Sequence, residues 1–125
     1  MEFTELIDQL SQQLNLQGLQ PGPGGRCAVR FDDVVVQFAA VPSANAVDLS
    51  AQVGVVDLRE PQVMQLLQST RDNSIALHWN ERGEVTVRQR FWLQVLSFPH
   101  FFRSLNLFIT QAEHWRVRLK ATYPV

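Results

Sequence analysis

The histidines and the single cysteine are the side chains best suited to metal binding or nucleophilic catalysis in this sequence. His100 and His114 share one predicted helix, but a rise of about 1.5 Å per residue puts them about 21 Å apart. His78 lies on a predicted strand, and Cys27 falls on the inward side of another. A metal ion needs several ligands in one coordination sphere. The pattern therefore predicts no metal site, and Cys27 is interpreted as a small buried apolar residue.

Asp32-Asp33 is a pair of neighbouring carboxylates, the residue type used in acid–base catalysis. Adjacent residues at a strand end point in different directions, and aspartate favours turns because it hydrogen-bonds the local backbone. We interpret the pair as a turn. Gly24-Gly25 lacks the lysine and the serine or threonine of a phosphate-binding loop, and no Gly-x-Ser-x-Gly motif is present. The glycine pair is therefore interpreted as a linker, and no catalytic or cofactor-binding motif is identified.

Arg88, Arg90 and Trp92 share one side of a predicted strand and are typical of a stacking surface for RNA or of a solvated face. The net charge of −1 argues against nucleic acid as a partner. The charge is unevenly spread, because acidic residues dominate positions 1–60 and arginine dominates positions 82–120. This asymmetry is typical either of two halves that face each other within one domain or of a charged contact surface.

The length of 125 residues fits one domain with a sizeable core. No apolar run approaches the roughly 20 residues of a transmembrane helix, so membrane insertion is not expected. The first five residues are acidic where a secretory signal would be basic, which predicts a cytoplasmic protein. One cysteine agrees with a reducing compartment.

Residues 26–40 contain two apolar runs on either side of Asp32-Asp33. A two-residue turn there predicts a β-hairpin. The facing pairs on one side are then Phe31 with Val34, Val29 with Val36 and Cys27 with Phe38. Those on the other side are Arg30 with Val35 and Ala28 with Gln37. Because Val35 is apolar on this second face, the hairpin needs a second covering layer or a partner.

Periodic apolar residues predict the other elements. A first helix carries Phe3, Leu6, Ile7, Leu10 and Leu14, with Gly18 as its terminator. A third strand alternates Val47, Leu49, Ala51, Val53 and Val55 inward. A short helix begins at Pro61 and ends near Ser69. A hairpin with Gly83 in a three-residue loop pairs Trp79 with Val85, Leu77 with Val87 and Ile75 with Gln89. A long last helix follows the N-cap Ser97. The prediction is an α+β fold in the order α-β-β-β-α-β-β-α, with helices packed on a mostly antiparallel sheet.

The succession of these segments resembles the class I type III secretion chaperones, the Tir-chaperone family, over nearly the whole chain. The segments that carry the resemblance are FTELIDQLSQQLNL, CAVRFDDVVVQFA, AVDLSAQVGVV, PQVMQLL and SFPHFFRSLNLFITQAEHWRVRL. The sequence departs from the family in being only mildly acidic and in its PGPGG loop. The resemblance implies one chaperone-like domain over residues 1–125.

The resemblance further implies a homodimer in the bacterial cytoplasm that binds the N-terminal region of a secreted effector and keeps it soluble and export-competent. The secretion apparatus is a further implied partner. Candidate effector contacts are Phe3, Ile7, Leu10, Leu14, Val35 and Phe38. Candidate dimer contacts are Val63, Met64, Leu67, Ile75, Leu77 and Trp79. Some residues of the first-helix stripe must also pack the core. Two alternatives stay open: a dimeric regulatory or interaction domain of this fold, and a small enzyme or ligand-binding protein with a deep pocket lined by His78, Arg88 or Arg90.

Overall fold

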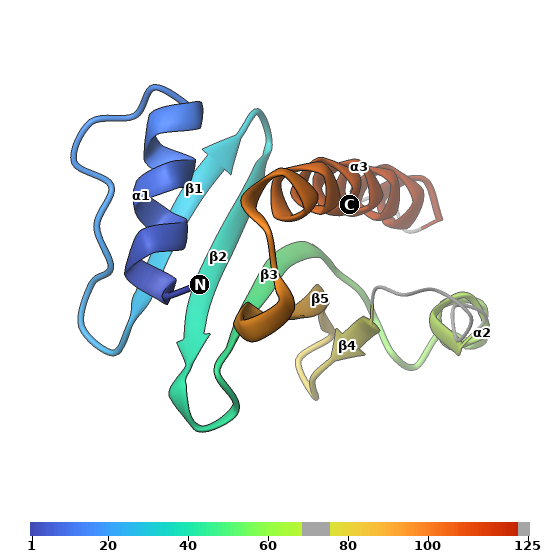
Figure 1. The fold of residues 1–125 in the computed structure, drawn as a ribbon. Helices are drawn as coiled ribbons and strands as arrows, with labels where there is room; N and C mark the ends of the chain where they lie inside the picture. Colours follow the sequence, from blue (N-terminus) through green and yellow to red (C-terminus); the bar gives the residue numbers. More distant parts are fainter. Residues whose placement is uncertain (69–75, 123–125) are drawn as a thin grey trace.

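The computed structural model describes residues 1–68 and 76–122. Its helices are α1 (Phe3–Gln13), α2 (Pro61–Gln68) and α3 (Phe98–Thr122), and short 3-10 turns cover Pro42–Ala44 and Leu93–Val95. Its strands are β1 (Arg26–Phe31), β2 (Val34–Val41), β3 (Ala46–Val55), β4 (Ala76–Trp79) and β5 (Glu84–Trp92). The strands form one antiparallel sheet in the order β1-β2-β3-β5-β4 (Figure 1). The predicted α+β fold and its element order are confirmed.

Both predicted hairpins form in the predicted register. The turn at Asp32-Asp33 pairs Phe31 with Val34 and carries the register through to Cys27 and Phe38. In the second hairpin, Trp79 lies opposite Val85 and Leu77 opposite Val87. Gly83 has a φ of 78°, the left-handed conformation that the three-residue loop requires. The expected pair of Ile75 with Gln89 falls outside the described residues.

A β-bulge in β3 changes the predicted facing of its last residues. Gln52 pairs with Thr86, but the next pair is Gly54 with Val85, so Val53 is an extra residue in β3. The extra residue reverses the alternation that follows. The prediction that Val55 points inward is therefore wrong: Val55 is 53% exposed, and Val56 is buried in its place.

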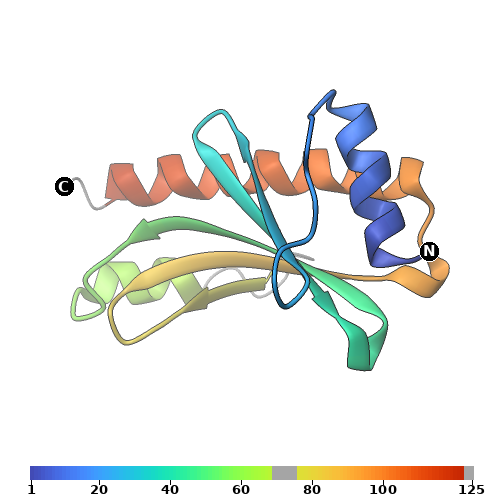
Figure 2. The same ribbon diagram turned by 90° about the vertical axis from the view of Figure 1, so that its left-hand side faces the viewer.

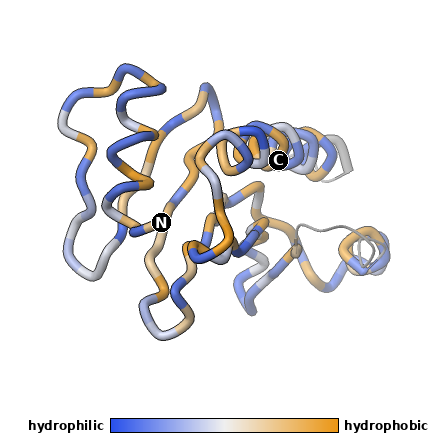
Figure 3. Tube along the Cα trace, in the orientation of Figure 1, coloured by the Kyte–Doolittle hydropathy of each residue, from blue (hydrophilic) through white to orange (hydrophobic). Residues whose placement is uncertain are grey.

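Helices α1 and α3 cover the same face of the sheet, and the core lies between them and the strands (Figures 1 and 2). The largest fully buried side chains include Phe38, Phe101 and Phe108. The rings of Phe91 and Phe101 meet edge to face at 5.2 Å between centroids. Hydrophobic and hydrophilic residues alternate along α1 and α3, as their one-sided packing requires (Figure 3). No helix in the described ranges is both long and apolar enough to cross a membrane.

The ends of the helices follow local sequence signals, with one difference from prediction. Pro61 begins α2, and the Ser97 hydroxyl accepts a hydrogen bond from the backbone N–H of His100 at the start of α3. Helix α1 ends before the predicted terminator Gly18. The last helical residue is Gln13, and Asn15, two residues later, adopts the left-handed φ of 54° that ends the helix.

Candidate partner-binding surfaces

The predicted effector contacts divide into buried and accessible residues. Ile7, Leu10 and Phe38 are completely buried in the protomer core, so they do not present a side chain to a partner. Phe3 and Leu14 are half-buried at the two ends of α1. Val35 is 41% exposed on β2. The expectation that the first-helix stripe must also pack the core therefore applies most strongly to its two central residues, Ile7 and Leu10.

The predicted dimer contacts divide in the same way. Val63 and Leu67 on α2 are buried within a single chain. Met64 on the same helix and the strand residues Leu77 and Trp79 are half-buried, packed against the core at one side only. Figure 1 places α2 beyond β4, at the opposite end of the sheet from α1. Ile75 lies outside the described residues.

The face of the sheet turned away from α1 and α3, here called the outer face, is built from aligned rows of side chains. One row runs across all five strands through Ala28, Gln37, Ser50, Arg88 and Ala76. The next row contains Arg26, Ala39, Asp48 and Arg90. Between Arg26 on β1 and Arg88 on β5, these rows carry Ala28, Ala39, Gln37, Ser50 and Asp48, of which Asp48 alone is charged.

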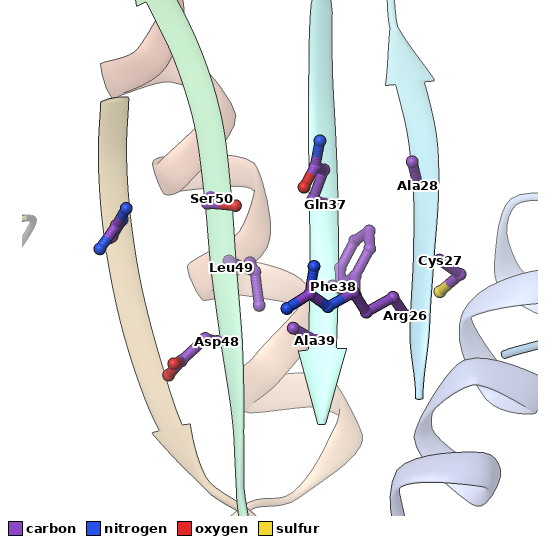
Figure 4. Close-up of a pocket in the computed structure, with 10 residues that line it drawn as sticks. Arg26, Cys27, Ala28, Gln37, Phe38, Ala39, Asp48, Leu49 and Ser50 are labelled. Carbon is purple, nitrogen blue, oxygen red and sulfur yellow. The ribbon is translucent and has the colours of Figure 1, made fainter. Parts of the chain in front are cut away.

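Two hollows include residues of these rows. The first, the arginine hollow, has a volume of about 460 Å³ and crosses four strands, from Arg26 on β1 to Arg88 on β5 (Figure 4). The second has a volume of about 640 Å³ and includes Val35 and Arg116. They share Gln37, Ser50 and Arg88. Both open to solvent, and of the three residues expected to line an enzyme pocket, His78, Arg88 and Arg90, they contain Arg88 alone.

Asp48 is the acidic residue in the lining of the arginine hollow, and it is already engaged. Arg90 donates from Nε to Asp48 Oδ1 at 2.7 Å and from Nη2 to Oδ2 at 3.0 Å. These hydrogen bonds and the adjacent negative charge raise the pKa of Arg90. Among residues 1–68 and 76–122, neither Arg26 nor Arg88 has an ion-pair partner. The hollow therefore has an unneutralised cation at each end.

The turn at Asp32-Asp33 is structural, as its sequence indicated. Asp32 has a left-handed φ of 55°. Asp33 accepts a hydrogen bond from Arg116 of α3 at 3.3 Å, and Arg116 also donates to Glu113 at 2.7 and 3.1 Å. The hydrogen bonds from Arg116 lower the pKa of Glu113. This cluster ties the β1–β2 turn to the last helix.

Strand β1 forms one edge of the sheet and offers part of its backbone to a partner. The residues that pair with β2 through hydrogen bonds alternate with Arg26, Ala28 and Arg30, whose backbone groups point to the outer edge. The carbonyl of Arg26 accepts a hydrogen bond from Gly22 at 2.7 Å. The preceding loop thus closes one end of the edge and leaves Ala28 and Arg30 to accept an added strand.

Within the described ranges, no group of three or more histidine, cysteine or acidic side chains is arranged to hold a metal ion. Cys27 is half-buried, and burial raises the pKa of its thiol, which disfavours the reactive thiolate. His100 and His114 are exposed on α3.

The site residues that the sequence did not single out are Arg26, Gln37 and Ser50. Alternation put the last two on outward strand faces, but the pairing of β3 with β5 that aligns Ser50 with Arg88 carries no local signal.

Several solved structures share this fold. A chain of the ExsC–ExsE complex superposes with a TM-score of 0.79 over 93% of this chain and 95% of that chain, at 20% identity. A chain of the HopA1–SchA chaperone–effector complex gives 0.75 over 91% and 92%, at 19% identity. A chain of the complex between the Yersinia pestis type III secretion chaperone SycH and a fragment of YscM2 gives 0.70 over 88% and 96%, at 15% identity. The fold is thus one found in complexes of type III secretion chaperones.

Sequence comparison assigns the family. A search of curated proteins gave no significant match. The model of the Tir chaperone protein (CesT) family, however, matches residues 5–116, which runs from α1 to near the end of α3. The chain belongs to this family, which is a family of chaperones and not of enzymes. The resemblance drawn from the sequence is confirmed.

Proposed function

We propose that this protein is a cytoplasmic bacterial chaperone that binds the N-terminal region of a type III secreted effector and keeps it soluble and competent for export. The observation that carries this proposal is the family match over residues 5–116. The chaperone–effector complex of HopA1 and SchA, which contains a chain of the same fold, supports it. The function needs no catalytic step and no cofactor. The secretion apparatus is a further partner under this proposal.

The effector binds in extended form, since an added strand gains main-chain hydrogen bonds at a sheet edge and apolar side chains fill adjacent grooves. The edge of β1 at Ala28 and Arg30 supplies the hydrogen bonds. Phe3, Leu14 and Val35 supply accessible apolar surface. Of these, Val35 is the most direct test because it lies outside the core cluster.

The working form is a homodimer assembled through α2 and the β4 edge. Met64, Leu77 and Trp79 are apolar, only partly covered by their own chain, and gathered at one end of the sheet. Leu77 and Trp79 occupy an edge strand, whose outer backbone groups also need a partner or water. Association through this end leaves the β1 edge and the outer hollows of each protomer available to the effector.

The test is co-purification of a secreted protein from the native host with the tagged chaperone. Roughly the first hundred residues of that secreted protein are then deleted, and the co-purification is repeated. Loss of binding on deletion is expected. The variant Val35→Asp should weaken retention of that protein, while Val117→Asp, at a position 55% exposed on α3, should not. Both variants should fold, because both side chains are exposed. A folded wild-type dimer that retains no secreted protein would overturn the proposal.

A further inference from the structure

The arginine hollow has a positive charge at each end and small or uncharged side chains between, which suits the binding of a polypeptide. Arg26 extends from β1 over β2 (Figure 4), and Arg88 of β5 also lines the hollow. Between them the floor consists of small or uncharged side chains: Ala28, Ala39, Gln37 and Ser50. Asp48 is occupied by Arg90, so the hollow does not neutralise its own terminal arginines. An anionic group of a binding partner at each end of the hollow would neutralise these two arginines.

We propose that the arginine hollow holds an extended acidic segment of the protein partner, with carboxylates four residues apart. The inference rests on the proposed chaperone function and specifies which part of a partner this face receives. Strands lie about 4.8 Å apart, so three intervals separate the backbones of β1 and β5 by about 14 Å. Arg26 lies in the row next to that of Arg88, two residues away along the strands, so their Cα atoms are about 16 Å apart. An extended chain advances about 3.3–3.4 Å per residue, so residues i and i+4 of one face are about 13–14 Å apart. The long arginine and glutamate side chains span the remaining difference, so carboxylates at this spacing can reach both Arg26 and Arg88.

The same geometry limits the residue between the two carboxylates. Residue i+2 points toward the floor formed by Gln37 and Ser50, because alternate side chains of an extended chain share a face. Only a small or polar side chain suits that position. The amide of Gln37 and the hydroxyl of Ser50 both donate and accept hydrogen bonds, so they can bind peptide groups of either polarity.

Charge favours a peptide over nucleic acid as the occupant. The affinity of a protein for nucleic acid grows with the number of phosphates it neutralises. The hollow offers two arginines that form no ion pair with the residues the structure describes, on a chain whose net charge is −1. The pair formed by Asp48 and Arg90 shows that an arginine on this face can take a carboxylate in bidentate geometry.

The test is a two-dimensional NMR titration of the full-length protein with a synthetic peptide, Gly-Ser-Glu-Ser-Ser-Ser-Glu-Ser-Gly, in low salt. Shifts should map to the outer-face residues Ala28, Gln37, Ser50 and Arg88. The peptide with glutamine in place of both glutamates should give no saturable shift. Two exposed ion pairs of ordinary strength predict that Arg26→Ala/Arg88→Ala weakens binding between about 2- and 30-fold. Arg103→Ala, on the exposed side of α3, is the matched control and should leave binding unchanged.

Several results would overturn the proposal: equal shifts with the glutamine peptide, shifts mapping to another surface, binding unchanged in the double variant, or stronger shifts with a single-stranded oligonucleotide of equal charge. The last result would assign the hollow to nucleic acid. The test of the acidic-segment proposal can be distinguished from the test of the chaperone function. If the double variant retains the secreted protein with wild-type affinity and salt dependence, the acidic-segment inference fails while the function stands. If the wild type retains no secreted protein, the function fails whatever the peptide does.

Discussion

The substitution Met64→Asp should separate the proposed dimer into folded monomers. Met64 is half-buried in its own chain, whereas its neighbour Leu67 is only 1% exposed. A charge at Met64 therefore alters mainly the surface offered to the second copy. A charge at Leu67 enters the core of the protomer itself.

The magnitude at the interface follows from burial and symmetry. A fully buried methionine contributes about 1.5–3 kcal/mol, so the accessible part of Met64 contributes about 0.5–1 kcal/mol per copy. A carboxylate set against an apolar surface adds about 1–2 kcal/mol of desolvation. Because a two-fold axis places Met64 of both copies at the interface, the loss counts twice and weakens dimerisation by about 3–6 kcal/mol. The dimer dissociation constant should rise by about 10²- to 10⁴-fold.

The corresponding change at Leu67 should destroy the fold instead. The lost apolar burial costs about 1.5–3 kcal/mol, and an unpaired charge in the core adds about 3–5 kcal/mol. The sum is comparable to the total stability of about 5–15 kcal/mol for a small domain. We expect Leu67→Asp to give insoluble or unfolded protein, so it cannot report on the dimer.

The assay is sedimentation equilibrium, with circular dichroism as the control for folding. Gln65→Asp adds the same charge at an exposed position of α2 and should remain dimeric. A folded Met64→Asp protein with the dissociation constant of the wild type would remove Met64 from the interface. A wild-type chain that sediments as a monomer at tens of micromolar would refute the dimer altogether. A soluble, folded Leu67→Asp monomer would contradict the division between core and interface.

Two further predictions concern the protomer. Gly83→Ala should lower the free energy of unfolding by about 2–4 kcal/mol, because a Cβ at a φ of 78° is strained and would overlap the carbonyl oxygen of Val56. Gly18→Ala, at a φ of 77° in open space, should cost only about 1 kcal/mol in the same urea titration, and equal losses would contradict the overlap. The hydrogen bonds from Arg116 lower the pKa of Glu113 below its ordinary 4.5, so their stabilisation is present above that pH and is lost as the pH falls through the folded pKa. Between about pH 6 and pH 3 the wild type should therefore lose more stability than Glu113→Gln, and parallel pH profiles would show that the carboxylate contributes nothing.

The two hairpins show how far the sequence alone predicts the fold. Their registers depend on side-chain alternation and on the turn residues at Asp32-Asp33 and Gly83, all of which act between residues close in the chain. The family resemblance likewise followed from the order and lengths of such local segments. These features were read correctly because neighbouring residues determine them.

Contacts between distant segments decided the rest. The bulge at Val53 turned Val55 outward. The alternation in β3 could not show this, since the bulge lies in the pairing of β3 with β5, a strand distant in the sequence.

The candidate surfaces likewise depend partly on local sequence and partly on contacts between distant segments. Residue type and a period of two are enough to predict which residues are apolar and which strand face each occupies. The packing of the whole chain is needed to show that Ile7, Leu10, Val63 and Leu67 are buried in the core while Val35 and Met64 stay accessible. Only the pairing of β3 with β5 placed Ser50 beside Arg88 and completed the arginine hollow. Burial and adjacency depend on which elements pack together, a property of the whole chain that no single segment carries.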